Sequence, residues 1–358
     1  MEEKTALIGM SGGVDSSVAA YLMVRSGYRC IGATMRLYDN ETLGQSKERT
    51  CCSLDDVEDA RSVARRLGIP YYVFNFKEDF EKQVIEKFVD SYEQGRTPNP
   101  CIDCNRHLKF DRLLRRAQEL GYEYVVSGHY ARIRRDETTG RYLLYKAADR
   151  AKDQTYFLAC LSQEQLAHIQ FPLGGLTKPE VRQIAEENGF LNARKHDSQD
   201  ICFVPDGDYA AFIERYTGEP NRPGNFVDGE GRVLGCHRGF VRYTIGQRRG
   251  LGLSLREPLY VCAKRAADNT VILGRGEELF SKSLTASGIN LIACERISSP
   301  LRLRAKVRYK QREQWATVEQ TAEDRIRVDF DEPQRAVTPG QAVVLYDGSC
   351  VVGGGTIE

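Results

Sequence analysis

The strongest constraint on the fold is the alternation of short apolar strands with helices in the first half of the chain. Thr5–Met10 is a short apolar run, and the helix predicted over Ser16–Ser26 follows it after a few glycine-rich residues. The same order then repeats, with further strands expected at Tyr28–Leu37, Tyr71–Phe76 and Tyr124–Ser127, and helices at Asp55–Leu67, Glu78–Tyr92 and about His107–Leu120. This order predicts an α/β, Rossmann-like parallel sheet with helices on both faces.

The second half of the chain has a different pattern. After about Pro205, glycine and proline become frequent and long helical periodicity disappears. From about Leu284 short alternating strands are expected, at Arg302–Arg312, Trp315–Gln320, Arg325–Phe330 and Ala342–Tyr346. That pattern is typical of a small antiparallel barrel or sandwich. The sequence therefore predicts an α/β domain over residues 1–206, a small central domain over 207–282 and a C-terminal β-barrel over 283–358.

Composition and charge restrict the cellular compartment and the kinds of binding partner that we expect. No stretch approaches the about 20 consecutive apolar residues of a membrane helix. The acidic start Met1-Glu2-Glu3 does not resemble a signal peptide, so we expect a cytoplasmic protein. The 51 Lys and Arg residues nearly balance 50 Asp and Glu, so any nucleic-acid surface must be a local patch. The 11 cysteines leave metal or thiol chemistry open, whereas a permanent disulfide framework is not expected.

A glycine-rich run between the first strand and the first helix predicts a phosphate site. In Ser11-Gly12-Gly13-Val14-Asp15-Ser16-Ser17, the paired glycines let the backbone approach a phosphate, and the helix N-terminus directs N–H groups at it. Ser16 and Ser17 add hydroxyl donors, and Asp15 could bind Mg²⁺. The run lacks the lysine of a Walker A loop, and no G-x-G-x-x-G pattern occurs. A Gly-Gly turn with an Asp or Ser helix cap is the alternative, but the position at a strand's carboxyl end favours phosphate.

Three cysteines, Cys101, Cys104 and Cys202, are candidates for thiol or metal chemistry. Pro98-Asn99-Pro100-Cys101-Ile102-Asp103-Cys104 contains two prolines, which predict a constrained loop before a helix. Nearby Arg106 and Lys109 are expected to favour the thiolate, with Cys104 the better placed thiol. The C-x-x-C spacing also fits half of a zinc site, but no second C-x-x-C or H-x₃₋₅-H supplies further ligands. Cys202, in His196-Asp197-Ser198-Gln199-Asp200-Ile201-Cys202-Phe203, would by itself most often be a buried core thiol.

Taken together, these motifs resemble a known family. The glycine-rich run is similar to the pyrophosphate loop of ATP pyrophosphatases, which split ATP into AMP and pyrophosphate. With Pro98–Phe110, Ser127–Arg132, Lys152–Leu158, Asp197–Phe203 and Tyr243–Leu251, the whole chain resembles the tRNA-specific 2-thiouridylases. The resemblance implies ATP-dependent 2-thiolation of the wobble uridine of tRNA (Lys, Glu and Gln type), giving 2-thiouridine, AMP and pyrophosphate. It also implies ATP, Mg²⁺ and persulfide sulfur, with tRNA and a cysteine desulfurase or sulfur-relay protein as partners.

The resemblance assigns roles to single residues. Cys104 is expected to be the nucleophile and Cys202 the persulfide carrier, with a redox disulfide Cys104–Cys202 formed during turnover. No protein metal site is implied beyond Mg²⁺ bound with ATP, for which Asp15 is a candidate ligand. ATP is expected to contact Gly9, Met10, Ser11, Gly12, Gly13, Val14, Asp15, Ser16, Met35 and Gly128. RNA is expected to contact Asn99, Pro100, Cys101, His129, Lys152, Asp153, Gln154, Arg308, Tyr309 and Gln341.

One position departs from the family. Some members carry an acidic residue with an acid–base role where this chain has Cys101. That role would fall to another group, such as Asp103, or be dispensable.

Basic residues alternate along the strand expected at Arg302–Arg312. On one strand all six would share a face, which a polyanion partner explains better than solvent: Arg302, Arg304, Lys306, Arg308, Lys310 and Arg312. A second basic cluster, from His237 to Arg249, includes Phe240 and Tyr243, which could stack on bases. The barrel is therefore predicted to bind tRNA. Two other functions stay open: an ATP pyrophosphatase with a small-molecule substrate, and a non-catalytic, zinc-dependent RNA-binding protein.

Overall fold

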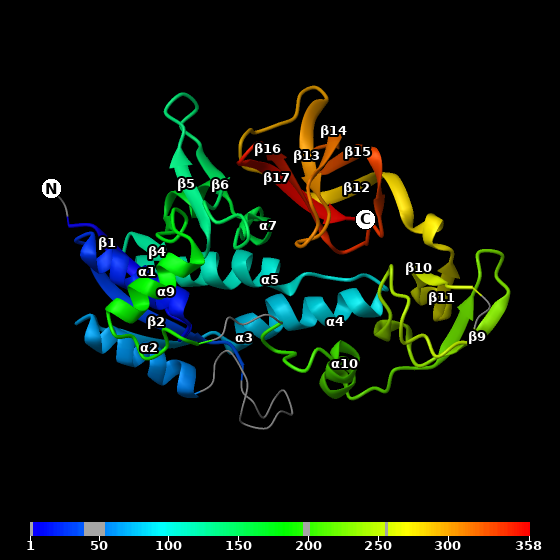
Figure 1. The fold of residues 1–358 in the computed structure, drawn as a ribbon, viewed down its shortest axis with the longest axis horizontal. Coiled ribbons are helices and arrows are strands. Elements are labelled where there is room, and N and C mark those ends of the chain that lie inside the picture. Colours follow the sequence, from blue (N-terminus) through cyan, green and yellow to red (C-terminus); the bar gives the residue numbers. More distant parts are fainter. Residues whose placement is uncertain (1–2, 39–53, 196–200, 255–256) are drawn as a thin grey trace.

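The computed structural model describes residues 3–38, 54–195, 201–254 and 257–358. Figure 1 shows the first strands and their helices at one end of the molecule, a separate β unit made by the C-terminal strands, and a small sheet at the other end. No helix within the described ranges is long and apolar enough to span a membrane. The prediction of a parallel α/β sheet, a small central domain and an antiparallel barrel is confirmed.

The first sheet is parallel, with strand order β3-β2-β1-β4-β7. The strands are β1 (Thr5–Gly9), β2 (Arg29–Arg36), β3 (Tyr71–Asn75), β4 (Tyr124–Val126) and β7 (Ile169–Gln170), and α1 (Val14–Arg25), α2 (Leu54–Arg66) and α9 (Lys178–Glu187) accompany them. Successive residues of a strand face opposite sides of the sheet. Leu7 accordingly joins an apolar cluster with Phe110, whereas Ile8 joins another with Val18. Both faces of the sheet are therefore buried at β1, whereas the edge strand β3 is partly exposed.

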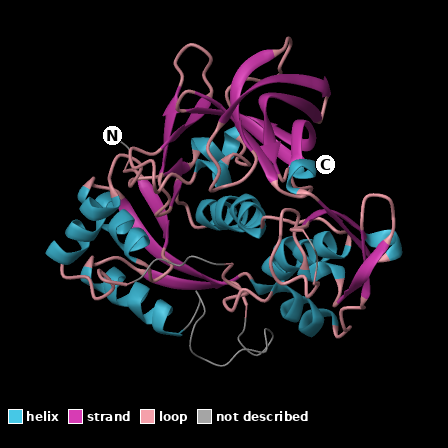
Figure 2. Cartoon of the chain, turned by 45° about the vertical axis from the view of Figure 1, so that its right-hand side comes forward, coloured by secondary structure: helices cyan, strands magenta, loops and turns pink. Residues whose placement is uncertain are grey.

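Two long helical runs cross the middle of the molecule (Figures 1 and 2). The first consists of α3 (Lys77–Phe80), the π-helical η1 (Glu81–Ile85) and α4 (Glu86–Glu93), and the second of α5 (Pro100–Asp103), the π-helical η2 (Cys104–Arg112) and α6 (Leu113–Glu119). The expected loop around Cys101 and Cys104 was wrong, because the second run begins at Pro100. Proline is well suited to the first turn of a helix, where its missing N–H is not needed. Both thiols therefore lie on a helix.

The central domain is built around a mixed sheet of order β10-β11-β8-β9. Its elements are α10 (Tyr209–Thr217), β8 (Gly224–Val227), β9 (Val233–His237), η3 (Phe240–Arg242), β10 (Tyr260–Arg265), η4 (Ala266–Asp268), β11 (Thr270–Gly274) and η5 (Gly276–Leu279). Phe226, Val261 and Leu273 form its small apolar core. Tyr243 and His237 are also buried here, 4% and 2% exposed, so the expectation that Tyr243 stacks on bases was wrong.

The C-terminal barrel has six antiparallel strands, in the order β12-β15-β14-β13-β16-β17, and closes through β12 and β17. They are β12 (Phe280–Leu291), β13 (Leu301–Lys306), β14 (Gln314–Ala322), β15 (Arg325–Arg335), β16 (Ala342–Asp347) and β17 (Cys350–Ile357). A hairpin of β5 (Ala131–Arg135) and β6 (Tyr142–Lys146) reaches from the first half of the chain and pairs with β17. The short α7 (Thr155–Leu158) and α8 (Gln163–Ala167) follow this hairpin.

The barrel does not carry the expected basic face. Strand β13 ends at Lys306, and the residues from 307 to 313 turn toward β14, so the six basic residues do not share one strand. Arg302 is paired with Asp331 across the sheet at 2.7 Å. The alternating pattern was misleading because a turn with polar side chains has the same appearance in sequence as the continuation of a strand.

Candidate active site

The glycine-rich run forms the connection between β1 and α1, at the carboxyl edge of the parallel sheet (Figure 1). Gly13 precedes the first turn of α1. Gly12 has a φ of +74°, and a Cβ there would lie 2.4 Å from the carbonyl oxygen of Asp56 in α2. Glycine is therefore required at this position both by the backbone conformation and by the space available. The helix N-terminus beside it offers N–H groups and a positive dipole end to an anion.

Side-chain hydroxyl groups stabilise this connection through hydrogen bonds to its own backbone. The Ser16 and Ser17 hydroxyls each donate to the carbonyl oxygen of Gly13 at 3.0 Å. The Ser16 oxygen also accepts a bond from the backbone N–H of Ser11 at 3.2 Å. On the neighbouring strand, the Thr34 hydroxyl donates to the carbonyl oxygen of Met10 at 2.6 Å, beside the expected ATP residue Met35. The run is thus a preformed loop.

Asp15 anchors the loop, with its side chain 30% exposed. Its carboxylate oxygens lie 2.7 and 2.9 Å from Nζ of Lys178, and the Tyr130 hydroxyl donates to it at 2.8 Å. Lys178 is only 7% exposed. Gly128 packs against the same place, since a Cβ there would lie 2.7 Å from the Asp15 carbonyl carbon and the Ser16 nitrogen. Asp15, Lys178 and Gly128 together therefore fix the first turn of α1.

Two residues that the sequence did not single out hold the loop from its other side. Asn192 donates to the carbonyl oxygen of Gly12 and to the Ser17 hydroxyl, both at 2.9 Å. Lys195 lies 3.4 Å from the same carbonyl oxygen and contacts Asp56 and Asp59 of α2. No local motif marks Asn192 or Lys195, because their partners are over 130 positions away in the sequence.

The Cys104 thiol is buried and protonated. Its side chain lies in the apolar cluster that includes Leu108, with the residue 8% exposed. Burial raises the pKa of Cys104 to about 11 and outweighs the nearby Lys109, which acts in the other direction. The expectation that Cys104 favours the thiolate was therefore wrong, because the loss of hydration destabilises the thiolate more than the positive charge of Lys109 stabilises it. Cys101 is exposed.

Cys202 lies near the first helical run. Its carbonyl oxygen accepts a bond of 2.8 Å from the Tyr38 hydroxyl, and its side chain is partly buried. The next residue, Phe203, packs on Phe80 and Phe88, with ring centroids 5.7 and 5.2 Å apart. The same helical run contacts the helix that carries Cys104. The structure does not join Cys104 to Cys202 in a disulfide, and residues 196–200 of the motif lie outside the described residues.

Three family models match successive parts of the chain. The tRNA methyl transferase HUP domain matches residues 4–206, the tRNA methyl transferase PRC-barrel domain residues 210–275, and the aminomethyltransferase beta-barrel domain residues 281–357. The tRNA-specific 2-thiouridylase MnmA of Acetivibrio thermocellus is 52% identical, with 100% of both chains covered. That of Clostridioides difficile is 50% identical over 99% of this chain and 98% of its own. The chain belongs to the tRNA-specific 2-thiouridylase family.

Among solved structures, a 4-thiouridine synthetase–RNA complex with bound ATP is similar over 56% of this chain and 45% of its own, with 20% identity and a TM-score of 0.38.

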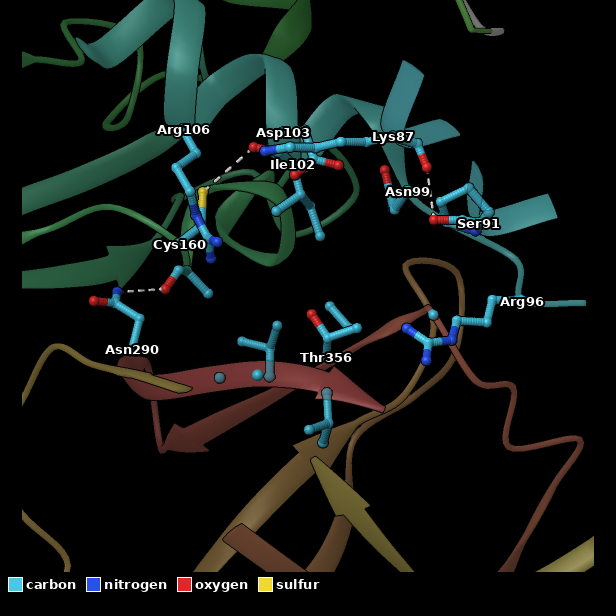
Figure 3. Close-up of a pocket in the computed structure, with 18 of the residues that line it drawn as sticks. Lys87, Ser91, Arg96, Asn99, Ile102, Asp103, Arg106, Cys160, Asn290 and Thr356 are labelled. Atoms are coloured by element: carbon cyan, nitrogen blue, oxygen red, sulfur yellow. Dashed lines mark hydrogen bonds between the residues drawn. The ribbon is translucent and has the colours of Figure 1, made fainter. Parts of the chain in front are cut away.

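In this thiouridylase, a cavity of about 280 Å³ lies between α4, α5 and the barrel. Figure 3 shows Asn99, Asp103, Arg106 and Cys160 on one side and Thr356 on the other. Burial raises the pKa of Asp103, although Lys87 and Arg106 counteract it. Asp103 lines this cavity, whereas Cys101 and Cys104 do not, and the charge of Asp103 adds to the raised pKa of Cys104.

Several residues expected to contact RNA have structural partners in the thiouridylase. Asp153 accepts bonds from the Ala147 N–H at 2.9 Å and the Thr155 hydroxyl at 2.7 Å. Gln154 accepts one from the Tyr130 N–H at 2.9 Å. Lys152 precedes them in the same turn. The Asp153 and Gln154 side chains therefore fix the chain between β6 and α7.

His129 is also partly buried and has partners within the protein. Its Nδ1 lies 2.8 Å from the Ser127 hydroxyl, and its ring packs on Phe110 and Phe171. Burial, together with the positive charge of Lys109, lowers the pKa of His129 well below its usual value. The imidazole is therefore neutral at neutral pH and offers a phosphate no charge.

Arg308, Tyr309 and Gln341 connect parts of the molecule. One Arg308 nitrogen lies 2.7 Å from the Ala336 carbonyl oxygen, 2.8 Å from the Thr338 hydroxyl and 3.3 Å from the Ile245 carbonyl oxygen. Tyr309 packs on Phe157 with ring centroids 4.4 Å apart. The Gln341 amide donates to the carbonyl oxygen of Thr97 at 2.8 Å. The barrel is thereby tied to the central domain, to α7 and to the segment before α5.

Among the residues that the structure describes, no group of three or more His, Cys, Asp or Glu side chains is arranged to hold a metal ion.

Proposed function

We propose that this chain catalyses the ATP-dependent 2-thiolation of the wobble uridine of tRNA of the Lys, Glu and Gln type, giving 2-thiouridine, AMP and pyrophosphate. The observation that carries this proposal is the 52% identity, over the full length of both chains, with a tRNA-specific 2-thiouridylase. The preformed loop between β1 and α1 supports the ATP-dependent half of the reaction. We also propose the domain limits 1–206, 207–282 and 283–358 and a cytoplasmic location, where ATP and tRNA are available.

In the first step, the loop binds the phosphates of ATP. The wobble base must leave its stack so that its C2 oxygen can attack the α-phosphate. Pyrophosphate then leaves, and C2 becomes electrophilic because its oxygen carries AMP. Backbone N–H groups at Gly12 and Gly13 and the dipole of α1 stabilise the phosphate charge, with Gly9 to Ser16, Met35 and Gly128 around the nucleotide.

Mg²⁺ bound with ATP would neutralise charge on the departing pyrophosphate, and Asp15 is the candidate residue to hold it. The carboxylate of Asp15 is held by Lys178 and Tyr130, so its fit to Mg²⁺ is poor in this arrangement. Asp15 would then act by holding the loop through Lys178 and Tyr130.

In the second step, sulfur is transferred from a persulfide on Cys202. The terminal sulfur attacks C2 and AMP leaves; Cys104 as thiolate then attacks the Cys202 sulfur and breaks the S–S bond, which leaves sulfur on C2 and forms the Cys104–Cys202 disulfide. In the alternative order, Cys104 attacks first and releases hydrosulfide, which attacks C2. Both orders require a cysteine desulfurase or sulfur-relay protein to load Cys202 and a reductant to open the disulfide. Both also require that RNA or ATP binding change the surroundings of Cys104, since burial keeps this thiol protonated.

The RNA contacts remain proposals. Asn99, Pro100 and the exposed Cys101, at the start of α5, are the proposed contacts of the target base. The other proposed contacts are His129, Lys152, Asp153, Gln154, Arg308, Tyr309 and Gln341. Those that already bond within the protein would have to exchange these bonds for bonds to RNA.

The test is mass spectrometry of nucleosides from unmodified tRNA incubated with this protein, Mg-ATP, a cysteine desulfurase and cysteine. We expect 2-thiouridine that depends on ATP and on the protein. Pyrophosphate release that needs tRNA but gives no 2-thiouridine would retain the adenylation step and refute the sulfur step. Neither product, with tRNA bound, would refute the proposed function.

A further inference from the structure

Two arginines at the junction of the barrel and the central domain carry positive charges that no described carboxylate balances. Arg308 follows β13, and Arg335 is the last residue of β15. The two lie close together, because Nη2 of Arg308 is 2.7 Å from the carbonyl oxygen of Ala336, the residue after Arg335. Burial and the positive charge of Arg335 both lower the pKa of Arg308, and neither arginine forms an ion pair within the described ranges. An anion between two like charges lowers the electrostatic energy of both.

Both guanidinium groups have N–H donors beyond those that the protein uses. A guanidinium carries five such donors. All three bonds of Arg308, to Ile245, Ala336 and Thr338, involve Nη2, and among the described residues its Nε and Nη1 have no partner. The Arg335 guanidinium contacts the ring of Tyr260, 5.2 Å from its centroid, and donates no hydrogen bond to the part of the chain that the structure describes. Arg308 is thus held in place by one nitrogen while its other donors stay available.

The backbone beside Arg335 is strained. Ala336 has a φ of +55°, a conformation that is uncommon for a residue with a Cβ and persists only where the surroundings hold it. Its N–H donates to the carbonyl oxygen of Leu279 at 2.7 Å, and its own carbonyl oxygen accepts bonds from Arg308 and from the Thr338 hydroxyl. This strained turn therefore fixes Arg308 and brings Arg335 next to it.

The central-domain motif Tyr243–Leu251 packs against the same turn. Gly246 has a φ of +89°, and a Cβ there would lie 3.0 Å from Cβ of Ala336 and 3.7 Å from Nη1 of Arg335. The carbonyl oxygen of the preceding residue, Ile245, is 3.3 Å from Nη2 of Arg308. The motif therefore contacts both arginines, and glycine is required where it passes closest to them.

We propose that Arg308 and Arg335 together bind one backbone phosphate of tRNA. The inference rests on the proposed function, which makes tRNA the substrate and Arg308 an RNA contact but gives Arg335 no role. Guanidinium groups bind phosphate oxygens through paired N–H donors, and both arginines have such donors available. A phosphate within a polyanion is favoured over a small free anion because Arg335 is exposed, and because Arg248 and Arg249, which are also exposed, follow in the same motif as Gly246.

Two other roles for Arg335 would have different consequences. If Arg335 only stabilised the fold by packing on Tyr260, its loss would lower the free energy of unfolding and leave the tRNA affinity of the folded protein unchanged. If Arg308 and Arg335 bound two separate phosphates, the effects of their substitution on tRNA binding would add. One shared phosphate predicts effects on affinity that do not add.

The experiment compares the wild-type protein with Arg308→Met, Arg335→Met and the double variant. Arg327→Met is the matched control, because Arg327 lies on the same strand as Arg335 and is exposed, but is already paired with Asp329 at 2.9 Å. Affinity for unmodified tRNA is measured by filter binding over a range of salt concentrations. Circular dichroism and urea denaturation verify that each variant is folded, and Arg335→Gln is the second neutral variant if Arg335→Met does not fold.

We expect Arg335→Met to weaken tRNA binding about tenfold at low salt, the order of one hydrogen bond to a charged group, and Arg327→Met to leave it unchanged. The double variant should bind little more weakly than the weaker single variant, and its salt-dependence slope should fall by about one, because losing either arginine already releases this phosphate. Unchanged affinity in the neutral Arg335 variants would overturn the proposal, as would a slope that falls by about two in the double variant. A wild-type protein that does not bind tRNA would instead refute the proposed function.

Discussion

The titration of Cys104 is the most direct test of the site as the structure shows it. Burial raises the pKa of this thiol to about 11 from an ordinary 9.0. Each pH unit corresponds to a tenfold change, so at neutral pH its thiolate fraction is about 100-fold below that of an ordinary cysteine. The thiolate is the species that reacts with iodoacetamide. We therefore expect the alkylation rate of Cys104 in the free protein to rise about tenfold per pH unit from 7 to 10 without reaching a plateau.

The assay separates ionisation from access. Peptide mass spectrometry after short exposure to iodoacetamide gives the rate at each pH, and fragment ions distinguish Cys104 from Cys101 in the shared peptide 97–106. Burial also slows access, but a constant access factor lowers all rates equally and leaves the shape of the profile unchanged. Circular dichroism at each pH verifies that the protein stays folded. A plateau below pH 9 would refute the conclusion that desolvation controls this thiol.

The same pKa difference has a consequence for stability. The folded protein keeps the Cys104 proton over a pH range in which the unfolded chain loses it, so the folded state binds more protons there. The contribution of this group to the free energy of unfolding is therefore constant below about pH 9 and falls as the pH rises from about 9 to 11. In Cys104→Ala this alkaline loss of stability should be smaller, which urea denaturation at pH 8 and pH 10 would measure.

Three further predictions concern the loop, the sulfur carrier and the barrel. Gly12→Ala should lower the free energy of unfolding by about 1–3 kcal/mol and weaken ATP binding, because of the positive φ and the close Asp56 carbonyl; Gly175→Ala, whose Cβ would meet nothing within 4 Å, is the control for urea denaturation. Cys202→Ser should abolish 2-thiouridine formation and leave tRNA affinity in a filter-binding assay nearly unchanged, whereas full turnover would contradict the two-thiol scheme. Arg308→Met should weaken tRNA binding and reduce the salt-dependence slope by about one; an unchanged affinity would place the RNA surface elsewhere.

The parallel sheet and the loop could be predicted because their determinants are local. The strand, the glycines and the helix around Gly12 and Gly13 follow one another in the sequence, and the conformations they require are intrinsic to those residues. The helix start at Pro100 was missed although it is also local, because proline both interrupts helices and begins them. Pro100 does mark a helix boundary, but the sequence does not say whether the helix ends before the proline or begins at it.

The state of Cys104 and the face of the barrel could not be predicted, because both depend on distant parts of the chain. The two cations near Cys104 in sequence suggested a thiolate, but the apolar cluster that buries it is assembled from strands and helices of the first domain together with barrel residues such as Val344 and Val351. Arg308 alternates with other cations in sequence, yet its partners come from residues 245, 336 and 338. Charge patterns in sequence therefore indicate which residues carry charge, whereas the fold decides which of those charges face solvent.

Gln341 is a residue that bonds within the protein and is also a proposed RNA contact. The resemblance assigns it to RNA, and the structure has its amide bonded to the carbonyl oxygen of Thr97, while the Thr97 N–H bonds to the carbonyl oxygen of Pro339. These bonds join the barrel to the segment directly before α5, the helix that carries Cys101 and leads into Cys104. If RNA took over the amide of Gln341, the bond to Thr97 would be lost while the bond from the Thr97 N–H to Pro339 would remain. The contact therefore makes Gln341 part of the joint between the barrel and the segment before α5, whether or not RNA touches it.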